Sequence, residues 1–116
     1  MIRIVNLRTY KPFNDEVMVR IDRVNPILGN PYYLHRENER DMICDLYDMR
    51  FEKKIKGDIE FISELERIVK LVLDGHNVVL GCWCVPKRCH GEIILEYVKQ
   101  RIKEENYEGP IIVNQD

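Results

Sequence analysis

The sequence has no long apolar run, no excess of one charge and no leader-like beginning, and each absence excludes a class of protein. No stretch approaches the roughly 20 apolar residues of a membrane-spanning helix. Eighteen basic and 20 acidic residues give a formal net charge of −2, which argues against non-specific binding of nucleic acid. The first residues lack a signal-peptide pattern. We therefore expect a cytoplasmic protein without a membrane partner, with its four cysteines as reduced thiols.

The sequence also has no internal repeat and no low-complexity tract. Its 116 residues and 45% hydrophobic content fit one globular domain, residues 1–116, with a modest core. The oligomeric state is left open by these patterns.

Apolar periodicity predicts a small three-layer α/β domain with the element order β-β-α-α-β-α, and a final β where Ile111 to Val113 follow a Gly-Pro break. The run of residues 77–82 is nearly all apolar, as expected for a central strand covered on both faces. The expected strands are residues 2–6, 17–21 and 77–82, and the expected helices are residues 37–51, 58–75 and 90–105.

The first two helices have predicted boundaries and buried faces. Asp58 is a candidate N-cap and Gly75 a candidate C-cap of the second helix. Residues 53–56 are a charged break between the two helices. The residues expected to face inward are Met42, Ile43, Leu46, Tyr47 and Met49 in the first helix and Ile62, Leu65, Ile68, Val69 and Val72 in the second.

Three of the four cysteines and one of the three histidines lie within nine positions, 82–90. The cluster falls between a strand and a helix, where α/β proteins usually bind ligands. Cys82 and Cys84 alternate along the chain and should point to one side, with Trp83 opposite them. We expect Trp83 in the core, with a stacking platform for a base as the alternative. Cys89 and His90 are expected in the first turn of the last helix.

Three segments resemble a known family: Val5-Asn6-Leu7-Arg8, Pro26-Ile27-Leu28-Gly29-Asn30-Pro31 and Cys82-Trp83-Cys84-Val85-Pro86-Lys87-Arg88-Cys89-His90-Gly91. In this order they resemble the domain family of unknown function numbered 4326, which is frequent in bacteriophages and bacteria. The resemblance covers roughly residues 1 to 100 and includes a helix that begins near an arginine. It implies a Rossmann-like layout, similar to small nucleotide-binding folds, and no established activity. Asp22 stands where members typically have glycine, which argues against a close backbone approach of a ligand there.

Two interpretations of the cysteine cluster do not involve a small-molecule ligand. Three thiolates and an imidazole are a standard zinc set, but the spacing C-x-C-x4-C-H is unusual and the adjacency of Cys89 and His90 makes one shared ion awkward, so we assign no metal ligands. Alternatively, the cysteines are small buried hydrophobes, as we expect for Cys44 on a helix face. A zinc-binding module and a phage-type protein-interaction or inhibitor domain thus remain alternatives.

The interpretation we favour is a small-molecule site for an anionic, nucleotide- or nucleoside-like and phosphorylated ligand. The start of a helix stabilises thiolates and attracts anions, and basic side chains suit a phosphate. If a reaction is catalysed, Cys84 or Cys89 would be the nucleophile and His90 the acid and base; no cofactor is identified. The candidate ligand-binding residues are Asn6, Arg8, Arg23, Asn25, Gly29, Asn30, Lys87, Arg88 and Gly91, of which Asn25 and Asn30 also suit turns.

Overall fold

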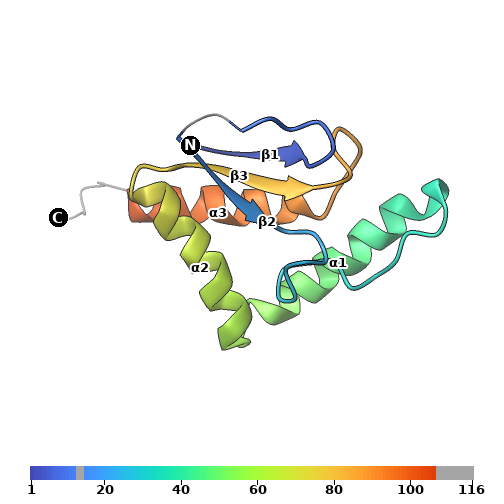
Figure 1. The fold of residues 1–116 in the computed structure, drawn as a ribbon. Coiled ribbons are helices and arrows are strands. Elements are labelled where there is room, and N and C mark those ends of the chain that lie inside the picture. The colour runs from blue at the N-terminus through green and yellow to red at the C-terminus, as the bar shows by residue number, and fades with distance from the viewer. Residues whose placement is uncertain (13–14, 107–116) are drawn as a thin grey trace.

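A computed structural model describes residues 1–12 and 15–106. These residues form a mixed α/β domain in which a three-stranded parallel sheet packs with three α-helices (Figure 1). The predicted final strand at residues 111–113 lies outside the described residues. The elements are β1 (Ile2–Asn6), β2 (Glu16–Arg20), the short 3₁₀ helix η1 (Glu37–Glu39), α1 (Arg40–Lys54), α2 (Ile59–Leu73), β3 (Asn77–Cys82) and α3 (Gly91–Glu105).

The third strand, β3, is the middle strand of the described sheet, whose order is β1-β3-β2. Val78 of β3 pairs in parallel with Ile2 of β1 and with Val17 of β2. Val78, Val79 and Leu80 are at most 1% exposed, which agrees with the predicted central strand. Because all three strands run the same way, their carboxyl ends meet at one edge, where the segment between β3 and α3 begins (Figure 1).

The helix α2 begins and ends as its sequence predicts. The Asp58 side chain accepts a hydrogen bond from the backbone N–H of Phe61 at 3.0 Å, which is an N-cap contact. Gly75 has a φ of 95°, and its N–H donates to the Val72 carbonyl while the His76 N–H donates to the Leu71 carbonyl. This pair of bonds is a Schellman motif, which requires the left-handed conformation that glycine adopts at no steric cost.

The buried face of α1 differs from the prediction. Met42 and Met49 are 53% and 62% exposed, so their predicted inward placement was wrong. The buried residues of α1 are Cys44, Tyr47 and Phe51, which lie on one face at i, i+3 and i+7. Apolar residues lie on two sides of this helix, and contacts with the rest of the fold select the face. The helix also continues through Lys54, into the predicted charged break, where basic side chains favour a helix end.

Aromatic contacts in the core join the three helices to one another. The Phe51 ring packs edge-on against Phe61 of α2 and Tyr97 of α3, with ring centroids 5.3 and 5.6 Å apart. The buried Tyr47 hydroxyl donates to the Leu28 carbonyl at 2.7 Å, which ties the loop after β2 to α1. None of the helices in residues 1–12 and 15–106 combines the length and apolarity needed to cross a membrane.

Candidate functional site

The segment between β3 and α3 is held from both sides. Asn6, at the end of β1, donates from Nδ2 to the carbonyls of Trp83 (3.3 Å) and Val85 (2.7 Å). The Lys87 N–H donates to the Cys84 carbonyl at 2.9 Å, which closes a tight turn. From the other side, Arg40 of α1 donates to the Arg88 carbonyl at 3.0 Å. The cysteine segment is therefore an ordered loop with a defined backbone.

A cavity of about 190 Å³ opens at the carboxyl end of β3. It lies among this loop, the segment after β2 and the start of α1, and all four cysteines of the chain line it. We call it the cysteine cavity. Its lining residues are Asp22, Arg23, Asn30, Tyr32, Tyr33, Leu34, Arg40, Ile43, Cys44, Cys82, Trp83, Cys84, Arg88, Cys89 and His90.

Three of the four thiols affect one another's pKa values. Cys82, Cys84 and Cys89 line the same cavity and pack in one cluster, and the Cys89 thiol is the largest cause of the lowered pKa of each of the other two. As a donor it stabilises a thiolate on either neighbour, so the pKa values of Cys82 and Cys84 each fall to about 6. The same interactions, together with burial, raise the pKa of Cys89. One S–H serves one acceptor at a time, and of the two acceptors Cys84 is the one whose pKa Arg40 also lowers. We therefore assign the thiolate to Cys84 and the thiol proton to Cys89.

His90 faces the cluster as a neutral imidazole. It is 7% exposed, and burial lowers its pKa. Its Nε2 lies 2.7 Å from the Ile21 carbonyl oxygen, so Nε2 carries the hydrogen and Nδ1 has the free lone pair. This Nδ1 lies 3.6 Å from the Cys89 sulfur. His90 can accordingly accept the Cys89 proton.

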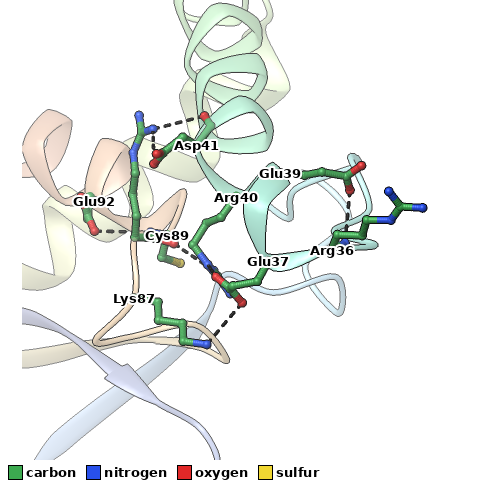
Figure 2. A network of polar contacts seen from close by, with 9 residues as sticks. Arg36, Glu37, Glu39, Arg40, Asp41, Lys87, Cys89 and Glu92 are labelled. Atoms are coloured by element: carbon green, nitrogen blue, oxygen red, sulfur yellow. Dashed lines mark hydrogen bonds and ion pairs between the residues drawn. The ribbon is translucent and has the colours of Figure 1, made fainter.

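Three arginines reach the cavity, each in a different setting. Arg40 pairs with Glu37 and lies over the cysteine loop (Figure 2). Arg88 pairs with Asp41 at 3.2 Å and with Asp45 at 2.9 Å.

Arg23 stacks on the Tyr33 ring, 4.1 Å from its centroid, and donates to the Tyr32 carbonyl at 3.0 Å. Across residues 1–12 and 15–106, Arg23 has no carboxylate partner within ion-pair distance. It is thus the arginine best placed to take an added anion.

The structure brings only some of the sequence-predicted site residues together. Cysteines 84 and 89, His90, Arg23, Asn30 and Arg88 line the cavity, while the other candidates lie outside its lining. Those outside the lining are Asn6, Arg8, Asn25, Gly29, Lys87 and Gly91.

Most of the candidates outside the lining have structural contacts instead. The Asn6 amide supports the cysteine loop, and Lys87 pairs with Glu37 at 3.2 Å (Figure 2). Asn25 Oδ1 accepts from the N–H groups of Ile27 and Leu28 at 3.0 and 2.9 Å, which confirms it as a turn former.

Of the two glycines beside the cavity, Gly29 has no room for a side chain. A Cβ on Gly29 would lie 2.6 Å from the carbonyl oxygens of Asn25 and Asp22, and both of these are backbone atoms. The Gly91 N–H donates to the Cys89 sulfur at 3.3 Å, from the first residue of α3. His90 is the N-cap of this helix and Cys89 precedes it. The two residues therefore lie immediately before the first helical turn, whereas the sequence predicted them within it.

Sequence reasoning missed several cavity residues. Arg40 is the arginine that begins α1, and the family pattern of a helix beginning near an arginine was the available signal. Trp83 was placed in the core, but it is 53% exposed, and that prediction was wrong. Its indole N–H instead donates to Asp22 at 2.9 Å, which gives the ring a polar anchor at the surface. No sequence signal pointed to this pair.

In the described part of the chain, no group of three or more histidine, cysteine, aspartate or glutamate side chains is arranged to hold a metal ion.

The fold and site define a small parallel α/β domain with a thiol-rich cavity at the ends of its strands. Residues 5–100 match the family described as "Domain of unknown function (DUF4326)". The match covers well over half of the chain, and the protein belongs to this family. No curated protein and no solved structure matches the chain.

Proposed function

We propose that the protein binds a compact anionic small molecule, of the nucleotide or nucleoside type and phosphorylated, in the cysteine cavity. The observation that carries the proposal is one cavity that combines arginines, aromatic rings and a reactive thiol. A cytoplasmic location, which would keep the thiols reduced, is part of the proposal.

The charges around the cavity support an anionic group on the ligand. Arg40 and Arg88 already have carboxylate partners, so their charges are partly neutralised. Arg23 has the stacked, fixed guanidinium that suits bidentate contact with a phosphate. The only carboxylate in the lining of the described cavity is Asp22, which is bonded to Arg20 and Trp83. A phosphate beside Arg23 would therefore form an ion pair with a guanidinium that has no carboxylate partner in the described residues.

The volume limits the size of the ligand. Pockets for drug-sized molecules usually hold about 300–1,000 Å³, and this one holds about 190 Å³. A mononucleotide with one end outside the cavity fits better than a dinucleotide. The partly exposed Trp83 ring and the Tyr32 ring offer apolar faces for a base at the cavity wall.

The place of the cavity in the sheet also supports the proposal. We infer a Rossmann-like, three-layer arrangement for the family, in which ligands bind outside the carboxyl ends of parallel strands. The cavity lies at that edge, beside the start of α3, where backbone N–H groups favour negative charge.

If the protein is an enzyme, Cys84 is the nucleophile. It is half-buried, lines the cavity and lies beside Arg40, which favours its thiolate. Cys89 suits that role less well, because its buried thiol keeps its proton. His90 would act as the acid and base by accepting a proton from the Cys89 thiol and returning it, since the Cys89 sulfur lies 3.6 Å from Nδ1.

A thermal-shift titration with the four nucleoside 5′-monophosphates, and with the matching nucleosides, tests the binding proposal. At least one monophosphate should raise the melting temperature by mass action, and its nucleoside should raise it less. Arg23→Gln should remove most of the difference, whereas Arg36→Gln, an exposed arginine outside the lining, should leave it unchanged. Equal shifts in both variants, or no shift with any monophosphate, would contradict the proposal.

A further inference from the structure

We infer that Cys84 and Cys89 form a reversible disulfide when a hydroperoxide oxidises Cys84 in the cysteine cavity. Both thiols line the cysteine cavity, and Cys84 packs against the buried cluster that contains Cys89. The segment between them includes a turn closed by the bond from the Lys87 N–H to the Cys84 carbonyl at 2.9 Å, and Cys89 is the largest cause of the lowered pKa of Cys84. The turn reverses the chain after Cys84, and both side chains face the same cavity. This redox chemistry needs no bound ligand and stands apart from the proposed function.

Cys84 is the thiol that meets the oxidant first. Cys82 and Cys89 are 1% and 3% exposed, whereas Cys84 is half-buried and lines the open cavity. The Arg40 guanidinium lines the same cavity as Cys84 and, after Cys89, lowers the pKa of Cys84, which favours the thiolate that attacks peroxides. Cys44 lines the same cavity, but burial raises its pKa and keeps it a thiol. Cys84 is therefore the one of the four cysteines that a hydroperoxide should oxidise first.

The chemistry proceeds in two balanced steps. The Cys84 thiolate attacks the distal oxygen of the hydroperoxide ROOH. The O–O bond breaks, and with one proton the products are Cys84 sulfenic acid and the alcohol ROH. The Cys89 thiol then attacks the Cys84 sulfur, an S–S bond forms, and the hydroxyl leaves as water with the thiol proton. Overall, two thiols lose two electrons and the hydroperoxide gains them.

The structure supplies a base for the second step. A buried thiol attacks only after it loses its proton, and the unprotonated Nδ1 of His90 lies 3.6 Å from the Cys89 sulfur. The bond from Nε2 to the Ile21 carbonyl at 2.7 Å fixes the ring in this tautomer. The N–H of Gly91, 3.3 Å from the same sulfur, stabilises the thiolate as it forms. Cys89 is thereby equipped to resolve the sulfenic acid.

Peptide mapping tests the inference on the full chain. The reduced protein is treated with one equivalent of hydrogen peroxide, blocked with iodoacetamide and digested with trypsin. Because cleavage follows Lys87 and Arg88, a disulfide between residues 84 and 89 joins the separate peptides 71–87 and 89–99. We expect this pair as the main product, a loss of two free thiols per chain, and full reversal by dithiothreitol.

Single variants identify the sulfur atoms in that pair. Peptide 71–87 also contains Cys82, so Cys82→Ser should keep the joined peptides and Cys84→Ser should lose them. Cys44→Ala is the matched control, since it removes a cavity thiol outside the trio, and it should keep the pair. A joined peptide that survives in Cys84→Ser but not in Cys82→Ser would overturn the inference. So would oxidation of Cys84 to sulfinic acid without a disulfide, or four free thiols after peroxide treatment. None of these readouts depends on nucleotide binding.

Discussion

The pH dependence of Cys84 alkylation is the most informative perturbation of the site. The Cys89 thiol, and then the Arg40 guanidinium, lower the pKa of Cys84 to about 6 from an ordinary value of 9.0. At pH 7 such a thiol is about 90% thiolate, against about 1% for an unperturbed one. We expect the alkylation rate of Cys84 to reach half of its plateau near pH 6.

The size of the rate effect depends strongly on pH. A thiolate that is less basic by three pKa units is also less nucleophilic, by about 15- to 30-fold. At pH 7 Cys84 has about 90 times the thiolate fraction of an ordinary thiol, and the lower nucleophilicity reduces its advantage in alkylation rate to about three- to sixfold. At pH 5.5 the advantage grows to about 25- to 50-fold, because almost no ordinary thiol is ionised there. The acid side of the profile is therefore the diagnostic region.

The assay is iodoacetamide labelling followed by quantification of the modified peptide, in Cys82→Ser protein so that peptide 71–87 reports one thiol. Arg40→Gln should move the midpoint upward, and Cys89→Ala should move it further, since Cys89 is the larger cause of the shift. Arg36→Gln is the control and should leave the midpoint in place. A midpoint near pH 9 in the Cys82→Ser protein, or an unchanged midpoint when Cys89→Ala is added to it, would refute the reasoning.

Three further predictions concern stability. Gly29→Ala should cost about 1–3 kcal/mol in urea unfolding, because its Cβ would meet two backbone oxygens at 2.6 Å, while Gly57→Ala, with nothing within 4 Å, should change stability by less than about 0.5 kcal/mol. Tyr47→Phe should cost about 1–3 kcal/mol by removing the buried 2.7 Å bond, and the exposed Tyr33→Phe should cost almost nothing. Burial lowers the pKa of His90 from 6.5, so below about pH 6.5 the unfolded chain binds a proton that the folded chain does not, and the free energy of unfolding decreases as the pH falls. His90→Gln should make the free energy of unfolding less dependent on pH in this range, and an equal pH dependence in both proteins would contradict the prediction.

The strands and caps were predictable because their causes are local. The apolar run 77–82 identified the buried strand β3 within its observed bounds, and Asp58 and Gly75 identified the ends of α2. The strand β2 lies one residue earlier than expected, at Glu16–Arg20. The face of α1 was harder, because Met42 and Met49 share the helix with a second apolar stripe, and only tertiary contacts decide between the two.

The cysteine cavity was predicted in place but not in full composition. The motif pointed to Cys84, Cys89 and His90, which line the cavity, because they lie close together in the sequence. Arg40 and Asp22 come from distant segments, and only the folded chain brings them to the same cavity. Asn6 is a polar residue at a strand end, a position typical of ligand contacts, and the structure shows its amide donating to two carbonyls of the cysteine loop.

The measurement that tests the central claim most directly is protection of Cys84 from iodoacetamide by a bound nucleoside 5′-monophosphate. The proposal places the ligand and the Cys84 sulfur in one cavity of about 190 Å³. A monophosphate that raises the melting temperature should therefore slow the alkylation of Cys84 at least about tenfold at saturation, because little volume remains for the reagent. An unchanged alkylation rate with the same saturating ligand would show that it binds elsewhere, and would contradict the account.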